Sequence, residues 1–393
     1  MQDLVECKRC LYKSNHPFGI TFIKGICSGC ITHEEKNKLD WESIFEELKV
    51  LLIKQRPKNK TVYDCVIPVR GDAEDYFVLS QIMNLGLNPL VVSVNDYFFN
   101  DIGWHNLHNL ITYFDVDSLF YSPNEHIYKE LVRTSLRRFS NVLLPSHLLN
   151  TSFPVHIARE RKIPLIVWGQ NQSVEQVGKF SHLNRVEMSR WNRREHDLFG
   201  IELDILIGTG AQLNVHHVDY YKYPKTKDLF RGGVRGIYLS NYLRWDPLKQ
   251  NSDSLKYNFQ PQLNTSSFDI YERAGSSVYY GIHDLLKLKN VGYRKVTDHL
   301  VREIRHQRIS RMEAKKEEIR FSSSKVEIES FFSWLDAKES GYRWFIKHEL
   351  KAYEGLIGHQ KPLKFKQTKI KKLLSNSSLP NNNFIRFGKG IHL

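Results

Sequence analysis

Short apolar runs alternate with helical periodicity between residues 61 and 210, and this alternation constrains the fold more than any other feature. The runs 63–69 (YDCVIPV) and 90–94 (LVVSV) are typical of strands that are buried on both faces of a parallel sheet. A helix is predicted to start near Ala73, before the turn at 86–89. These segments form a β-α-β unit, which favours an open α/β sheet.

The same patterns outline the rest of the chain. We expect a helix at 103–114, strands at 117–121 and 163–169, and an amphipathic helix at 41–56. Beyond residue 210 the chain is aromatic and rich in loops, and helices are predicted within 282–318, 325–337 and 340–353. The predicted organisation is a metal-binding ribbon (1–40), a helical linker (41–60), an α/β nucleotide domain (61–210), a substrate-binding helical region (211–355) and a basic tail (356–393).

Four of the five cysteines form two CxxC pairs, Cys7/Cys10 and Cys27/Cys30. Two residues between thiols let each pair turn tightly and present both sulfurs to one ion, so the quartet predicts a structural tetrathiolate zinc site. An iron–sulfur centre is the less favoured alternative. Cys65 lies in an apolar run and is interpreted as a core thiol.

Composition narrows the class of protein. At 393 residues, 41% of them hydrophobic, the chain can bury a core and fold into two or three domains. It has no apolar run of membrane-spanning length, and the N-terminal residues do not resemble a secretory signal, so we expect a cytoplasmic protein with reduced thiols.

The net charge of +14 predicts an anionic partner, such as a nucleotide, a phosphorylated sugar or nucleic acid. The acidic residues end at Glu354, while lysines and arginines continue to Lys389. This tail is interpreted either as a solvated segment or as a polyanion-binding one.

The loop after the first predicted strand, residues 68–76 (PVRGDAEDY), is where an α/β sheet usually binds phosphate. It matches neither a Walker motif nor GxGxxG. Asp72 can cap the following helix, or it can help to hold a magnesium ion. Taken alone, the loop does not decide between these roles.

Taken together, the segments resemble the N-acetyl sugar amidotransferases of bacterial surface-polysaccharide synthesis, which include lipopolysaccharide O-antigen proteins. The resemblance extends to about residue 320. It rests on the two CxxC pairs with HPFGI (16–20) between them, and on YDCVIPV (63–69), GLNPLVVSV (86–94), WGQN (168–171) and GYRKVTDH (292–299) with EIR (303–305).

The resemblance implies a PP-loop ATP pyrophosphatase-like (HUP-type) domain. It also implies an ATP- and magnesium-dependent reaction that converts the N-acetyl group of a nucleotide-linked sugar into an acetamidino group. Ammonia would come from a partner glutaminase through a cyclase-like subunit, because this chain shows no obvious glutaminase nucleophile.

The loop after the first predicted strand departs from the sequence of this family. The family's loop is Ser-Gly-Gly-Lys-Asp-Ser, and here the aligned residues are RGDAED (70–75), so phosphate donors are replaced mostly by acids. Either the anion site has been rearranged around Arg70, or ATP activation has been lost and the chain is a silent scaffold. A tRNA-modifying or other nucleic-acid-binding PP-loop protein is a further alternative, which the absence of a further cysteine pair disfavours.

The candidate site residues follow from these motifs. Arg70, Asp72 and Asp75 are expected to act in catalysis. Nucleotide is expected at the strand ends, at Pro68, Val69, Arg70, Gly71, Val94, Asn95, Gly169, Gln170 and Asn171. The substrate is expected at Glu175, Arg294, Asp298, His299, Arg302 and Arg305.

Overall fold

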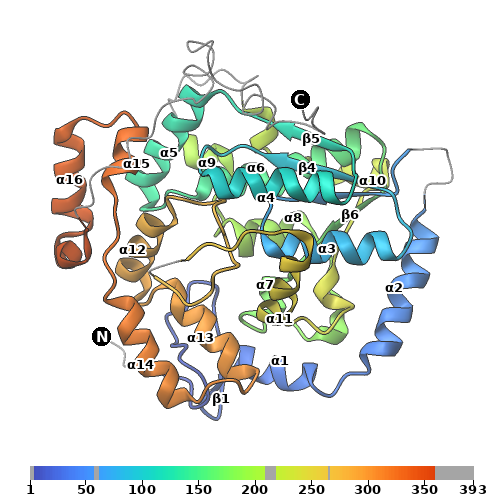
Figure 1. The fold of residues 1–393 in the computed structure, drawn as a ribbon, viewed down its shortest axis with the longest axis horizontal. Coiled ribbons are helices and arrows are strands. Elements are labelled where there is room, and N and C mark those ends of the chain that lie inside the picture. The colour runs from blue at the N-terminus through green and yellow to red at the C-terminus, as the bar shows by residue number, and fades with distance from the viewer. Residues whose placement is uncertain (1–3, 57–61, 209–217, 264–265, 359–393) are drawn as a thin grey trace.

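The computed structural model describes residues 4–56, 62–208, 218–263 and 266–358. At its centre is a parallel sheet of five strands in the order β5-β4-β3-β6-β7. The strands are β3 (Cys65–Pro68), β4 (Pro89–Val94), β5 (Ser118–Tyr121), β6 (Leu165–Trp168) and β7 (Arg235–Tyr238). The predicted α/β class with a parallel sheet is therefore confirmed, and Figure 1 shows the sheet between layers of helices.

The strand order places a topological switch point between β3 and β6. The chain runs outward from β3 through β4 to β5, then returns to pair β6 with the other side of β3, where Val66 opposes Ile166. In open α/β sheets, ligands bind beyond the carboxyl ends of the strands at such a point.

Each face of the sheet has its own helices. Val66 packs in a core with side chains of α5 (Glu125–Phe139) and α6 (Leu144–Glu160). Cys65 and Ile67 face the opposite core, which α2 (Trp41–Gln55), α3 (Ala73–Asn84) and α4 (Asp101–Tyr113) help to form. The alternation follows from the two-residue period of a strand, and both faces of β3 are buried as its composition predicts.

Residues beyond 210 contribute to the sheet as well. Strand β7 pairs in parallel with β6, from Leu165 opposite Arg235 to Trp168 opposite Tyr238. The sequence pattern predicts no strand in this region. The four-residue run RGIY has too short a pattern to distinguish it from the surrounding loops, and it becomes a strand by pairing with the edge of β6.

Short helices link the sheet to the C-terminal region. After β6 come α7 (Gln172–Glu175), α8 (Arg190–Asn192), a π-helical turn (193–197) and α9 (Leu203–Ile207). Helices α10 (Thr226–Gly232) and α11 (Pro247–Ser252) flank β7. Single 3-10 turns lie at 182–184, 219–221, 239–241 and 253–257.

The C-terminal region is helical as predicted. It comprises α12 (Tyr280–Val291), α13 (Lys295–Arg305), α14 (Arg311–Ser322), α15 (Glu329–Trp334), α16 (Glu339–Glu349) and a 3-10 turn at 351–356. Gly292, with a φ of 78°, ends α12 and separates it from α13. The predicted basic tail lies almost entirely outside the described residues.

The N-terminal segment packs against the C-terminal helices. It contains β1 (Phe22–Ile23), paired antiparallel with β2 (Ile26–Cys27), and then α1 (Ser28–Lys36). Its cysteines share a core cluster with Tyr293, Val296 and Leu300 of the α13 region. Figure 1 shows α1 and β1 beside α13 at the bottom of the view. No helix within the part of the chain that the structure describes is both long and apolar enough to cross a membrane.

A glycine at the turn after β3 fixes the loop against α4. Gly71 has a φ of 77°, and a Cβ added there would lie 2.5 Å from the backbone nitrogen of Leu107. Gly86 also has a positive φ, 74°, but no atom lies within 4 Å of the corresponding Cβ position. Comparing substitutions at Gly71 and Gly86 therefore separates the cost of backbone strain from the cost of steric overlap.

We predict that Gly71→Ala is the more destabilising of the two alanine substitutions. Both should cost about 1–2 kcal/mol for the left-handed backbone, and Gly71→Ala about 1–3 kcal/mol more because its Cβ overlaps α4. Urea unfolding of both variants measures the difference. Equal losses of unfolding free energy would contradict the close packing of this loop.

Candidate functional site

A polar cavity of about 330 Å³ lies beyond the carboxyl ends of the strands. It is lined by the loop after β3, Asp96 after β4, Gln170 after β6 and the segment from Glu272 to His306. Tyr12 and His33 of the N-terminal segment complete the wall. The cavity therefore occupies the position where the sheet topology predicts a ligand site.

The loop after β3 is closed by one of its own side chains. Oδ2 of Asp75 accepts hydrogen bonds from the backbone N–H groups of Arg70, at 2.7 Å, and Asp72, at 3.0 Å. Asp72 is the N-cap of α3 and forms a capping box with Asp75. The positive end of α3 thus already holds an internal carboxyl group.

The guanidinium of Arg70 is also engaged. Nη1 forms an ion pair with Asp96 at 2.9 Å, and Nη2 donates to the carbonyl of Ser276 at 2.5 Å. The Ser276 hydroxyl donates in turn to Asp72. These contacts fasten the segment around residue 276 over the loop, so Arg70 serves first as a structural clamp.

The acids of this loop hold their protons more tightly than usual. Burial raises the pKa of Glu74 to about 7, although Oε1 of Glu74 accepts the backbone N–H of Gln170 at 2.9 Å. Burial and the neighbouring Asp72 charge raise the pKa of Asp75 well above its ordinary value. Glu74 can therefore exchange a proton with a bound ligand near neutral pH.

A nucleotide triphosphate requires free backbone donors at this loop. Two of those amides are occupied by Asp75, and Arg70 is paired with Asp96. Asp72 and Asp75 would add negative charge if they ionised beside phosphates. The loop as it is folded does not fit a triphosphate.

The other expected nucleotide positions are of two kinds: some line the cavity, and others support the backbone around it. Gln170 lines the cavity. Asn171 is buried, its backbone N–H bonds to Ser240 and its side-chain oxygen accepts from Ser173. Gly169 is needed for close approach, since an added Cβ would lie 2.0 Å from Oε1 of Glu74.

At the end of β4 the ligand-facing residue is one position later than expected. Val94 is buried in the sheet, and Asn95 forms a turn in which its side chain accepts the N–H of Tyr97. Asp96 faces the cavity instead. Pro68 and Val69 carry the backbone into the loop, and neither lines the cavity.

Five of the expected substrate residues line the cavity, and most of their polar atoms have partners. These residues are Glu175, Asp298, His299, Arg302 and Arg305. Glu175 pairs with the buried Lys36 at 2.7 Å, and Arg302 pairs with Asp269 at 2.8 Å.

The structure corrects the expectation for Arg294. Its side chain is 0% exposed, and Nε pairs with the buried Asp284 at 2.7 Å. Nη1 donates to the carbonyls of Ser322 and Ser324 after α14. Arg294 therefore ties α12, α13 and α14 together, and its buried side chain does not line the cavity.

Arg273 is the functional candidate that sequence reasoning missed. It lines the cavity, and its φ of 58° is an unusual backbone conformation for an arginine. The guanidinium lies 4.4 Å above the ring of Tyr280, and Nε forms an ion pair with Oε1 of Glu272 at 3.5 Å without hydrogen-bond geometry. No local sequence pattern marks this position, because its conformation depends on the loop packing on Gly103.

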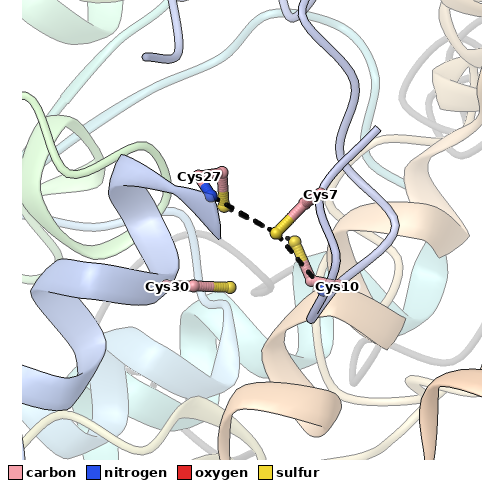
Figure 2. A group of neighbouring side chains, drawn as sticks. All are labelled: Cys7, Cys10, Cys27 and Cys30. Atoms are coloured by element: carbon pink, nitrogen blue, oxygen red, sulfur yellow. Dashed lines mark hydrogen bonds between the residues drawn. The ribbon is translucent and has the colours of Figure 1, made fainter. Parts of the chain in front are cut away.

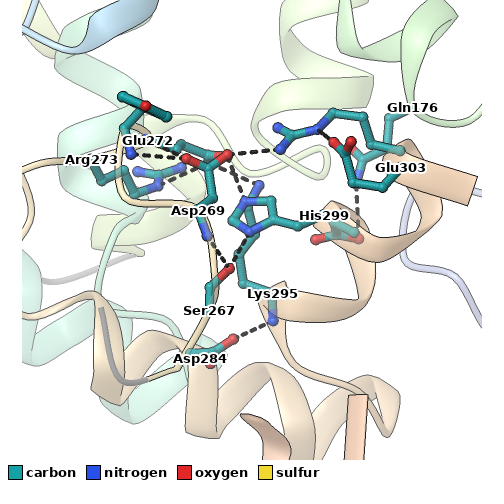
Figure 3. Close-up of polar contacts among 12 residues, drawn as sticks. Gln176, Ser267, Asp269, Glu272, Arg273, Asp284, Lys295, His299 and Glu303 are labelled. Atoms are coloured by element: carbon teal, nitrogen blue, oxygen red, sulfur yellow. Dashed lines mark hydrogen bonds and ion pairs between the residues drawn. The ribbon is translucent and has the colours of Figure 1, made fainter. Parts of the chain in front are cut away.

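A hydrogen-bonded chain of side chains borders Arg273 (Figure 3). The Ser267 hydroxyl contacts Nδ1 of His299 at 2.5 Å, and Nε2 of His299 contacts Glu272 at 2.7 Å. Burial alone would raise the pKa of Glu272, but Lys295 and His299 outweigh it and hold that pKa well below its usual value.

Asp269, Glu272 and His299 are close enough to share a metal ion. However, Lys295 lies 3.0 Å from Glu272, and Arg302 lies 2.8 Å from Asp269. These cations already neutralise the carboxylates, so the group is a salt-bridged cluster and not an open metal site.

The four N-terminal cysteines converge as predicted (Figure 2). All four thiols are free and buried, and their sulfurs lie within 4.8 Å of one another. The Cys10 and Cys27 sulfurs are 3.6 Å apart, close to the separation of about 3.8 Å in a tetrahedral zinc site with bonds of about 2.3 Å. Cys7 also accepts backbone N–H bonds, from Arg9 and Cys27. The donor set can hold a metal ion such as zinc.

Comparisons with known proteins place few limits on function. No protein-family model matches the chain, and no curated protein matches it either. Among solved structures, NMN synthetase from Francisella tularensis aligns with 57% of this chain and 99% of its own, at 11% identity and a TM-score of 0.29. Similarity this low does not transfer a function.

The metal site predicted at the four cysteines can be tested with a control variant at the fifth cysteine. Cys10→Ser should abolish the binding of about one metal ion per chain, because it removes one of four ligands. Cys65→Ser should keep the metal, because Cys65 is buried in β3, in a different core cluster. Elemental analysis of both purified variants tests this, and a metal-free wild-type protein would contradict the assignment.

Glu74 should make stability depend on pH. Its folded pKa of about 7 exceeds the ordinary 4.5, so the folded chain binds this proton more tightly than the unfolded chain does. The contribution of Glu74 to stability should therefore fall as the pH rises from 4.5 to about 7. Glu74→Gln removes this penalty, so its stability relative to wild type should be higher at pH 8 than at pH 5 in urea unfolding. A difference that does not change with pH would contradict the raised pKa.

Proposed function

We propose that this chain binds a nucleotide-linked N-acetyl sugar in the central cavity without holding ATP on the loop after β3. The observation that carries the proposal is the contrast between two walls of the cavity. On one wall Asp75 occupies the loop amides. On the other wall Arg273 lines the cavity, with its guanidinium over the ring of Tyr280 and its Nε 3.5 Å from Oε1 of Glu272.

The chemistry of the cavity suits a sugar diphosphate. Arg273 and Lys295 line the cavity, where phosphate oxygens would compete for them with Glu272, to which both cations are paired. Asn150, Gln170 and Gln172 bring amide groups that can bind sugar hydroxyls or the N-acetyl group. A volume of about 330 Å³ lies within the range of small-molecule sites.

The proposed role fits the resemblance to N-acetyl sugar amidotransferases in its scaffold form. The chain would hold the sugar nucleotide for surface-polysaccharide synthesis within a complex of glutaminase and cyclase-like subunits. The cysteine cluster would hold structural zinc.

An ATP-dependent amidotransferase is the second candidate. One observation favours it: the loop after β3 opens on the same cavity as Arg273. Such an enzyme would first have to release Asp75 from the amides of Arg70 and Asp72. The two candidates therefore differ in whether the folded chain binds ATP.

Calorimetry with UDP-N-acetylglucosamine and, separately, with ATP and magnesium distinguishes the candidates. We expect binding of the sugar nucleotide and none of ATP. Arg273→Ala should weaken sugar-nucleotide binding about 10–100-fold, the loss expected for a hydrogen bond to a charged group. Arg320→Ala is the matched control, since Arg320 is exposed on α14, outside the cavity.

Asp75→Ser provides the complementary experiment. It frees the two amides, so this variant should gain affinity for ATP that the wild-type chain lacks. ATP binding by the wild-type chain that is tighter than sugar-nucleotide binding would favour the second candidate. Absence of sugar-nucleotide binding would refute the first.

A further inference from the structure

Arg305 stands at the end of α13, between the cysteine cluster and the wall of the cavity. Its Nη2 lies 3.7 Å from the Cys27 sulfur, and Nη1 donates to the carbonyls of Glu175, at 3.1 Å, and Gln176, at 2.8 Å. The guanidinium also lies 5.4 Å from the ring centre of Tyr12. One side chain on α13 therefore contacts two segments that are far from it in sequence, the N-terminal segment and residues 175–176.

The approach of Arg305 to the sulfurs depends on the residue inside the second CxxC pair. A Cβ on Gly29 would lie 2.2 Å from Nη2 of Arg305 and 2.5 Å from the carbonyl oxygen of Gln176. Gly29 therefore leaves the space in which the guanidinium reaches both groups.

A buried tetrathiolate requires a counter-charge. A divalent ion with four thiolates carries a net charge of about −2, and uncompensated buried charge is costly. Arg305 brings a permanent positive charge to one of the sulfurs. Hydrogen bonds to metal-bound thiolates are the kind of outer contact that tunes metal affinity.

The other side of the same guanidinium holds the cavity wall. Gln176 and Glu175 both line the cavity. The amide of Gln176 donates to Asp298 at 3.2 Å and to the Tyr12 hydroxyl at 3.3 Å. A shift of Arg305 would release the backbone of Glu175 and Gln176, and with it the contacts of Gln176 with Asp298 and Tyr12, all of which line the cavity.

We infer that Arg305 is a positioning residue that couples the cysteine metal centre to the central cavity. It stabilises the thiolates through one nitrogen and orders the wall after α7 through the other. A lysine would keep the charge but could not make both sets of contacts, because an ammonium lacks the planar fork. The link to ligand binding rests on the proposed function, whereas the link to the metal does not.

The test measures metal release and ligand binding on the full chain. Arg305→Lys should release zinc to a chromogenic chelator about 10–100-fold faster than wild type and should bind UDP-N-acetylglucosamine more weakly. Arg308→Lys is the matched control: Arg308 follows the same helix but pairs with Asp246 and Glu303. It should leave both measurements unchanged.

A second variant guards against a loss of folding. Gly29→Ala retains Arg305 but displaces both the guanidinium and the Gln176 carbonyl that it holds, and it should reproduce both effects. Zinc release at the wild-type rate in either folded variant would overturn the inference. Faster release with unchanged ligand affinity would overturn the coupling. If the wild-type chain binds no sugar nucleotide, the proposed function fails, and the rate of zinc release still decides whether Arg305 supports the metal centre.

Discussion

The carboxyl group of Asp75 on the amides of Arg70 and Asp72 is the interaction on which the site depends. At the corresponding position a phosphate-binding loop leaves its donors open to solvent and ligand. Here an acid attached to the first turn of α3 satisfies them. Because the contact is intramolecular, it needs no bound ion to stabilise the loop. The acidic residues of this loop thus form a self-consistent structure with its backbone amides.

The closed loop determines how the charged side chains pair in the rest of the cavity. Arg70 is drawn to Asp96, and the segment around Ser276 is fastened above it. That segment carries Arg273, whose left-handed backbone is supported by the close approach of Gly275 to Gly103. The strain places a cation opposite a wall of acids. In the proposed function, the cation nearest to a bound anion would therefore lie in the loop before α12 and not in the loop after β3.

Sequence reasoning succeeded where a feature is local. Strand burial and the CxxC spacing are each encoded within a few residues, and both appear in the structure. It failed where a role depends on distant partners. Arg294 looked like a substrate ligand because cations surround it, yet Asp284 and the end of α14 use its donors. Asn95 and Asp96 differ by one position, and only the packed strand end shows which of them faces the cavity.

The cysteine segment makes contacts far outside the motif that defines it. A four-cysteine ribbon could fold as a separate unit around its metal ion. Here Ser28 donates to the carbonyl of Val177, and the Tyr12 hydroxyl bonds to Asp298, 286 positions away. Tyr12 and His33 line the cavity beside Arg305. The segment is therefore part of the cavity wall, and a metal ion bound there would stabilise the cavity as well as the ribbon.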